Sequence, residues 1–386
     1  GSDEQKAAYA RGYRMAPNDW RVDGFAGRVV GGSYNPNLFG VEQVSVLKGP
    51  AGLLYGPSGL PGGMTNLVSK KPREVAATTV ETRLRTFGGG EVGFGSRVSH
   101  EVELDTTGSV TSDGRLLYRF LGSLERSAFA AESPADDNQC YRLSFTYKID
   151  RGGRFQFTPM AEWSREDRAQ RAPTISPASS RTTADGRTDY TLADVSPRSV
   201  NLAAGGRVDT NVTWGADLTA EFSSAWKASA GFRLVDRDYV NDAYAINSAT
   251  LTQADGRDAR SWVVSRRHSR ANNNYQVTSF DANSTYEFVP ASRVRSLVQV
   301  GLNARRNQNT AASTGNGADQ SPVNIYSGVA ASPLIANAPA LAPGNATDAL
   351  AWNAYAQSQN ELFERWIFTA GFGYSRETSE STTPAG

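Results

Sequence analysis

The chain contains very little cysteine and histidine. Its 386 residues include one Cys and two His, too few for the ligands of a His/Cys metal site. Cys140 has no partner for an intrachain disulfide. His100 and His268 lie far apart in the sequence, and neither belongs to a Ser/His/Asp set of the kind that activates a nucleophile. These residues therefore offer neither a His/Cys metal site nor a catalytic triad.

A charge excess of one sign and long hydrophobic runs are missing too. Lys and Arg total 40 against 39 Asp and Glu, a net charge of +1, whereas nucleic-acid-binding proteins usually carry a basic excess. No stretch approaches the roughly 18 apolar residues of a membrane-spanning helix, and no signal peptide opens the chain. These absences suit a soluble protein, but they leave open an outer-membrane β-barrel, whose strands are apolar only at alternate positions.

Alternation of apolar and polar residues is abundant in the chain. In the segment YRLSFTYKI, residues 141–149, the Tyr, Leu, Phe, Tyr and Ile side chains share one face, and Arg, Ser, Thr and Lys share the other. Residues 154–164, 208–222 and 366–374 show the same pattern. A period of two is typical of β-strands with one apolar and one polar face, whereas a helix would scatter these apolar residues around its axis.

The connections between these strands alternate in length. Short turns alternate with long polar connections at roughly 127–140, 168–207, 240–272 and 308–350, which is typical of a transmembrane barrel. A soluble antiparallel β-protein would explain the strands but not this alternation. We therefore predict a mostly β fold, a transmembrane antiparallel β-barrel. It has about eleven strands, near residues 78–86, 92–104, 115–126, 141–149, 154–167, 208–222, 226–239, 273–288, 294–307, 351–362 and 365–376.

A turn-rich segment precedes the first of these strands. The segment GPAGLLYGPSGLPGGMTNLVSKKP, residues 49–72, contains six Gly and four Pro, which permit sharp turns in a confined space. With RGY at 11–13, VDG at 22–24 and VEQVSVLKGPAGLLYG at 41–56, it resembles the plug of TonB-dependent siderophore receptors, which fills a barrel of twenty-two strands. The resemblance implies the C-terminal part of a plug domain at residues 1–75 and the first half of a barrel at residues 76–386.

The same resemblance implies that this chain is a fragment. The first half of the plug, the short segment that TonB grips and the remaining barrel strands would be absent. Half a barrel leaves two unpaired strand edges, which cannot sit in lipid. We therefore expect that the chain alone neither inserts stably nor transports, and that the full-length receptor is a monomer in the outer membrane of a Gram-negative cell.

The resemblance also implies the function and the ligand-binding residues. Such a receptor binds a ferric siderophore at the cell surface and imports it with energy from the TonB–ExbB–ExbD complex. It catalyses no covalent step, so the resemblance implies that the protein is not an enzyme. The iron arrives in its chelate, so no cofactor and no protein ligands for the metal are expected. Tyr34 is the preferred contact, because its ring can pack on a ligand while its hydroxyl donates a hydrogen bond. Two outward-pointing plug loops would supply Arg14, Asn18, Ser33, Tyr34 and Asn35. For Asn18, Ser33 and Asn35, capping of a turn explains the residue as well.

Two further residues are expected to join the plug to the barrel wall. They are Glu42 and Lys48. The family commonly has Arg at the position of Lys48, and Lys cannot make the bidentate contact to a wall carboxylate that Arg would make. Lys70 and Lys71, at the exit from the plug, are expected to be solvated charges. The long connections at 168–207, 240–272 and 308–350 are expected to close over the mouth as mobile loops.

Other interpretations of the sequence stay open. The same architecture could import cobalamin, haem or an oligosaccharide, and His268 is the only His placed to serve as a haem ligand. A more distant alternative is a soluble β-rich adhesin or carbohydrate-binding protein. GGGEVG at 88–93 fits the dinucleotide-binding pattern G-x-G-x-x-G, but β-alternation follows where that site needs a helix, so a hairpin loop is the better interpretation.

Overall fold

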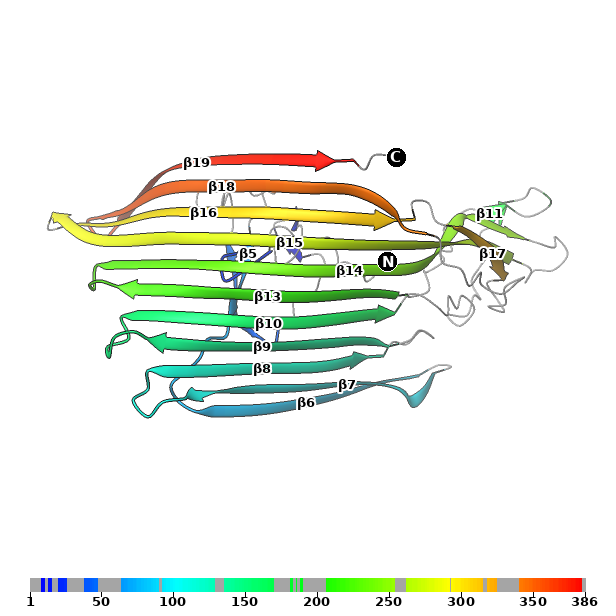
Figure 1. The fold of residues 1–386 in the computed structure, drawn as a ribbon, viewed down its shortest axis with the longest axis horizontal. Helices are drawn as coiled ribbons and strands as arrows, with labels where there is room; N and C mark the ends of the chain where they lie inside the picture. The colour runs from blue at the N-terminus through cyan, green and yellow to red at the C-terminus, as the bar shows by residue number, and fades with distance from the viewer. Residues whose placement is uncertain are drawn as a thin grey trace.

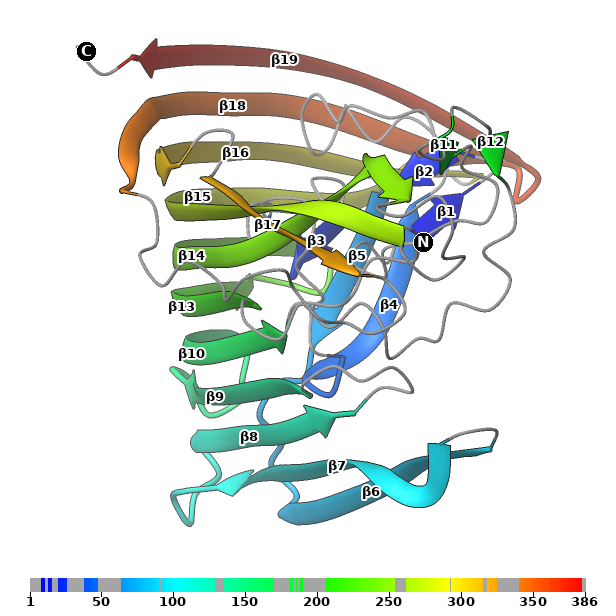
Figure 2. The same ribbon diagram turned by 90° about the vertical axis from the view of Figure 1, so that its right-hand side faces the viewer.

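A large antiparallel sheet that curves around a small one dominates the structure (Figures 1 and 2). It is a computed structural model. No helix in the described part of the chain is long and apolar enough to cross a membrane. The structure describes residues 8–10, 13–15, 20–25, 38–47, 64–89, 92–128, 135–169, 181–182, 185, 188–189, 206–253, 262–291, 293–314, 318–324 and 340–383.

Eleven strands of the large sheet form an up-and-down meander, which we call the wall. Each wall strand pairs antiparallel with the next wall strand along the chain. The strands are β6 (Ala77–Gly89), β7 (Val92–Ser109), β8 (Leu116–Ser127), β9 (Asp136–Lys148), β10 (Phe155–Ala169), β13 (Gly206–Glu221), β14 (Trp226–Gln253), β15 (Trp262–Ala291), β16 (Val294–Ser313), β18 (Ala342–Leu362) and β19 (Trp366–Thr382). These strands confirm the eleven predicted from the sequence, and the short turns lie together at one end of the sheet (Figure 1).

The two faces of the wall differ in polarity, as the alternation predicted. On β13, Trp214 and Leu218 are exposed on the outer face, whereas Asp209, Asn211 and Thr213 are buried on the inner face. Aromatic pairs mark the two ends of the outer apolar band, with Phe222–Trp226 at the short-turn end and Tyr141–Trp163 and Trp352–Tyr374 toward the other. This arrangement matches the aromatic girdles of transmembrane barrels.

A three-stranded sheet lies on the concave side of the wall (Figure 2). This inner sheet consists of β3 (Trp20–Val22), β5 (Met64–Ser69) and β4 (Val41–Leu47), with β5 in the middle, parallel to β3 and antiparallel to β4. Burial of Val22, Phe25, Met64 and Leu67 gives it a small apolar core. A separate short hairpin joins β1 (Ala8–Ala10) and β2 (Tyr13–Met15).

Two wall strands run much further than the sequence predicted. Strands were expected at 226–239 and 273–288, but β14 continues to Gln253 and β15 begins at Trp262, so most of the expected 240–272 loop is strand. Their register is unbroken from Trp226↔Tyr286 to Asn247↔Ser265. Ladder hydrogen bonds do not require apolar side chains, so the pairing continues where the alternation stops.

The expected 308–350 loop also contains wall strand, because β16 runs to Ser313 and β18 begins at Ala342. Shorter strands occur within the long connections as well. They are β11 (Arg181–Thr182), β12 (Thr188–Asp189) and β17 (Ala318–Asn324), of which β17 pairs with β15.

Candidate functional site

The contact between the inner sheet and the wall begins at a tight turn after β3. Asp23 and Gly24 both have positive φ values, 54° and 84°, a conformation that Gly and Asp adopt more readily than most residues. The turn is fastened to β5, because Asp23 N donates to the Leu67 carbonyl at 2.9 Å and Gly24 N donates to Asn66 Oδ1 at 2.9 Å. Ser69 N donates to Asp23 Oδ1 at 2.7 Å. The Asp23 carboxylate is therefore held in a fixed direction.

That carboxylate faces two buried arginines of the wall. Arg142 of β9 lies 3.6 Å from Asp23 Oδ2, and Arg233 of β14 lies 3.7 Å from the same atom. Each arginine also pairs with a carboxylate of another wall strand. The nitrogen–oxygen distances are 4.0 Å for Arg142–Glu162 and 2.8 Å for Arg233–Asp217. Burial alone would raise the pKa of Asp23, but Arg142, the Ser69 N–H and Arg233 outweigh it and hold that pKa below its usual range.

An aromatic contact completes this junction. The Phe25 ring lies under the Arg233 guanidinium, with 4.3 Å between the charge and the ring centroid, a favourable cation–π distance. Gly231 of β14 makes room for the ring. A Cβ added at Gly231 would lie 2.9 Å from Phe25 Cζ and 2.7 Å from Asp217 Oδ1. A glycine on the wall is therefore what allows Phe25 to approach so closely.

Beyond β5, residues 70–74, which we call the exit segment, are bound to β7 and β8. Lys70 Nζ donates to Asp105 Oδ2 at 3.1 Å. Arg119 donates to both oxygens of Asp105, at 2.9 and 2.6 Å, and to the Lys71 carbonyl at 2.9 Å. The side chain of Lys71 is exposed, as expected, but that of Lys70 is ion-paired and only 21% exposed. The sequence missed this pair because β7 is far from Lys70 along the chain.

The rest of the exit segment is held in the same way. Arg73 N donates to Thr107 Oγ1 at 2.8 Å, and Lys148 Nζ donates to Glu74 Oε2 at 2.7 Å. Glu42 forms an exposed ion pair with Arg73 at 2.5 Å. The described partner of Glu42 therefore belongs to the exit segment, and its contact with the wall stays a prediction.

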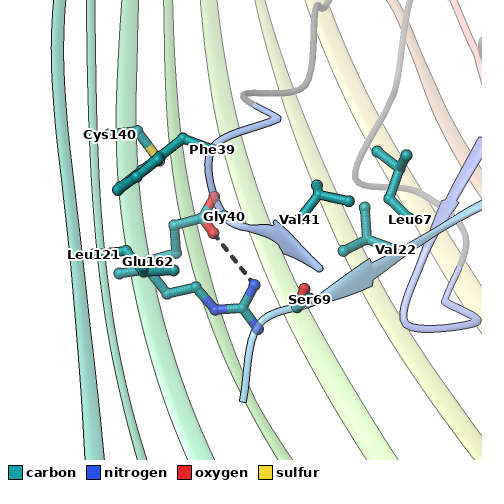
Figure 3. A pocket seen from close by; sticks show the side chains of 10 residues that line it. Val22, Phe39, Gly40, Val41, Leu67, Ser69, Leu121, Cys140 and Glu162 are labelled. Atoms are coloured by element: carbon teal, nitrogen blue, oxygen red, sulfur yellow. Dashed lines mark ion pairs between the residues drawn. The ribbon is translucent and has the colours of Figure 1, made fainter. Parts of the chain in front are cut away.

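A small pocket lies between the inner sheet and the wall (Figure 3). Arg142 and Glu162 form its charged side, and the half-buried thiol of Cys140 lies nearby. The described residues contain no group of three or more His, Cys, Asp or Glu that could hold a metal ion. The lining residues are Val22, Phe39, Gly40, Val41, Leu67, Ser69, Leu121, Cys140, Arg142 and Glu162.

A second buried cluster lies further along the wall, towards the long connections. Asp209 is fully buried on β13. It accepts a hydrogen bond from Arg237 Nε at 2.8 Å and another from Arg207 Nε at 2.5 Å. Tyr275 and Tyr239 lie against the two guanidinium groups. The sequence indicated a polar inner face, but only the strand register shows which charges meet.

The predicted ligand-binding residues fall largely outside the described part of the chain. Arg14 lies in β2, where its backbone pairs with Tyr9. Its role as a ligand contact stays a prediction, and so do the roles of the others. Those outside the described residues are Asn18, Ser33, Tyr34, Asn35 and Lys48.

The sequence is similar to those of known proteins. Residues 1–63 match the family model described as TonB-dependent Receptor Plug Domain. The chain is 32% identical over 119 residues to the ferrichrome outer membrane transporter/phage receptor of Escherichia coli K12, an alignment that covers 30% of this chain and 14% of that protein. It is 31% identical over 115 residues to a metal-pseudopaline receptor of Pseudomonas aeruginosa, covering 30% of this chain and 15% of that protein.

Solved structures show the same fold. The open form of the ferric-catecholate import receptor Fiu from E. coli K12 superposes with a TM-score of 0.78 at 19% identity, covering 97% of this chain and 55% of that one. The ferripyoverdine receptor of P. aeruginosa superposes with a TM-score of 0.72 at 17% identity, covering 98% and 48%. This chain therefore spans about half the length of these structures. The resemblance to TonB-dependent receptors drawn from the sequence is confirmed.

Proposed function

We propose that this chain, which is related to the TonB-dependent receptors and shares their plug-and-barrel fold, is part of an outer-membrane receptor for a ferric siderophore. The receptor binds the chelate at the cell surface and imports it with energy delivered by TonB and its ExbB–ExbD partners. The relatives support this cargo, because those named above include receptors for ferrichrome, a ferric catecholate and ferripyoverdine. The chelate passes unchanged, so the proposal includes neither a catalytic step nor a resident cofactor.

The observation that carries the proposal is the ionic contact at Asp23. A plug that must let cargo pass needs a contact with the wall that can open. Arg142 and Arg233 each keep a wall carboxylate, Glu162 and Asp217 respectively. If Asp23 withdraws, neither arginine is left as an unpaired buried charge, which would be strongly unfavourable. The inner sheet can therefore leave the wall at a moderate cost in free energy.

The exit segment, in contrast, is bound firmly to the wall. Arg119 and Asp105 bind it through a bidentate ion pair and a hydrogen bond to backbone, and such charge-assisted contacts are among the strongest in proteins. The segment would stay attached to β7 and β8 while the inner sheet moves. In this mechanism, a chelate binds over the plug loops, TonB pulls, and the inner sheet separates from the wall around this fixed point.

A titration of the receptor encoded by the complete gene tests the proposal. Purified in detergent, it is titrated with ferric complexes of hydroxamate, catecholate and carboxylate siderophores while tryptophan fluorescence is recorded. We expect saturable quenching by one iron chelate at low concentration, and weaker binding after Tyr34→Ala. Quenching by cobalamin or haem alone would overturn the siderophore assignment and keep the fold.

A second candidate cargo comes from one relative. The metal-pseudopaline receptor favours a chelate whose metal is not restricted to iron. Repeating the titration with the chelator loaded with zinc or nickel separates the two candidates, since a receptor for ferric chelates discriminates against those complexes.

A further inference from the structure

A row of polar side chains crosses the inner face of the wall close to the Asp23 junction. The strand register places Ser164 of β10 opposite Asn211 of β13, and Asn211 opposite Arg237 of β14. Their exposed fractions are 8%, 5% and 2%. The three side chains therefore form one continuous buried row across three strands.

Part of the hydrogen-bonding capacity of the row is unused. Among the described residues, neither the amide oxygen nor the amide nitrogen of Asn211 has a hydrogen-bond partner, and the same holds for Ser164 Oγ and Arg237 Nη1. The Nε atom of Arg237 donates a hydrogen bond to Asp209. Buried polar groups in folded proteins nearly always find partners, so several unused groups side by side point to a partner that comes and goes.

The position of the row fits a path for cargo. Arg142, which meets Asp23, lies opposite Glu162, and Glu162 lies opposite Thr213. Ser164 and Asn211 are each two residues further toward the long connections, a distance of about 7 Å along a strand. A chelate that enters between the inner sheet and the wall from that side meets this row just before it reaches the Asp23 junction.

The free atoms indicate the chemistry of the cargo. Arg237 Nη1 and Asn211 Nδ2 can donate, Asn211 Oδ1 can accept, and the Ser164 hydroxyl can do either. Carboxylate, hydroxamate and phenolate oxygens accept from the first two groups, and a hydroxyl or amide of the same ligand donates to Asn211 Oδ1. An oxygen-rich chelate satisfies the row, whereas an apolar ring system does not.

We propose that Ser164, Asn211 and Arg237 form a transit site that hydrogen-bonds an oxygen-rich metal chelate on its way past the inner sheet. The site rests on the proposed function. Because its atoms are closed off from solvent in the described state, it becomes available only after a movement that exposes it. A weak site within the path, separate from the resting site at the mouth, suits a conduit in which cargo must enter and then leave.

The decisive variant is Asn211→Leu in the receptor encoded by the complete gene. Leu has the same branching and number of side-chain heavy atoms as Asn but no polar atoms, and removal of an unpaired buried amide offsets the cost of its larger volume. Three quantities are measured: the affinity for ferric citrate, a ferric tris-hydroxamate and a ferric tris-catecholate, the rate of uptake of the bound chelate by cells, and the thermal unfolding temperature. We expect unchanged affinity, an unlowered unfolding temperature and uptake slowed roughly three- to tenfold, as for one or two lost hydrogen bonds.

Thr146→Val is the matched control. Thr146 is 4% exposed on the inner face of β9, and its hydroxyl is bonded to Thr158 at 3.0 Å. This variant removes a used hydrogen bond, so we expect a lower unfolding temperature with normal uptake. Equal loss of uptake in both variants would show a general effect of the wall and overturn the transit site.

Every other result for Asn211→Leu also overturns it. A loss of affinity would place Asn211 in the resting site, unchanged uptake would remove its role in transport, and a lowered unfolding temperature would show a structural water bonded to the amide. Failure of the proposed function looks different, because the unaltered receptor would then bind none of the three iron chelates.

Discussion

At the residue scale, the junction depends on a few side chains whose surroundings are unusual. Gly231 stands where a Cβ would collide with Phe25 and Asp217. Asp23 holds a left-handed turn and at the same time faces two buried arginines. Each of these residues serves the contact between two layers, and each gives a separate test of it.

Gly231→Ala should loosen the inner sheet. The added methyl group must displace Phe25 or Asp217, and such overpacking costs about 1–3 kcal/mol. We expect limited proteolysis of the receptor to cut the inner sheet faster. The control is Gly40→Ala, whose added Cβ has its nearest neighbour, Leu121 Cδ1, at an ordinary 3.5 Å. Equal cleavage rates in the two variants would contradict the packing argument.

The Asp23 contact should depend on pH only in acid. The folded-state pKa of Asp23 lies below its usual range, near 3.9 in an unfolded chain. Its stabilising effect is therefore complete above about pH 5 and is lost as the pH falls through the lower, folded-state pKa. Protease resistance of the inner sheet should stay constant between pH 7 and about pH 5 and decline below about pH 4.

Asp23→Asn should remove this contribution at neutral pH. The amide still accepts a hydrogen bond from Ser69 N, but Arg142 and Arg233 both lose an anionic partner, at a cost of about 2 kcal/mol. In the Asp23→Asn receptor, the protease resistance of the inner sheet should no longer change with pH in the acid range. A decline as steep as that of the unaltered receptor would assign the effect to other carboxylates.

At the scale of elements, the exit segment and the inner sheet are held by different kinds of contact. The inner sheet meets the wall at Asp23 through ion pairs of 3.6 and 3.7 Å. The exit segment has shorter bonds to Asp105, Arg119 and Thr107. The shorter, backbone-directed bonds should make the exit segment the firmer attachment.

Arg119→Lys tests that difference. Lysine keeps the charge but cannot bind Asp105 and the Lys71 carbonyl together. We expect amide hydrogen exchange in residues 70–74 to accelerate by about tenfold or more, as for loss of a charge-assisted bond, with β3 and β5 unchanged. Lys71→Ala is the control, because Arg119 bonds only to the backbone carbonyl of Lys71. This variant should leave the exchange rates of residues 70–74 unchanged.

At the scale of the whole molecule, the wall is an open sheet. In the described part of the chain, β6 pairs on one side with β7, and β19 pairs on one side with β18. Each therefore presents one edge of unpaired backbone groups, which lipid does not tolerate.

The 386-residue chain by itself should therefore fail the heat-modifiability test of a closed barrel. In mild detergent, we expect its migration on a gel to be the same with and without heating. The receptor encoded by the complete gene should instead migrate faster before heating. A compact, heat-sensitive band from the 386-residue chain would mean that its edges close or pair between copies.

Much of the wall was predictable because the alternation of apolar and polar residues is a pattern of neighbouring residues in the sequence. Tyr141, Leu143 and Phe145 alternate with polar residues at a spacing that only a strand places on one face. The extension of β14 to Gln253 was missed for the same reason. Beyond Tyr239 the apolar alternation ends, while the hydrogen-bonded ladder with β15 continues.

The sequence by itself determined the eleven wall strands without the full lengths of β14 and β15, the inner and outer faces of those strands, and the plug signature, because each depends on residues close together in the chain. The tertiary structure alone decided that Asp23 meets Arg142 and Arg233, that Lys70 pairs with Asp105, and that Ser164, Asn211 and Arg237 form one row. These contacts join residues far apart in the sequence. They depend on the register of eleven strands and on the curvature that brings the wall around the inner sheet, and a one-residue slip would turn each side chain to the opposite face.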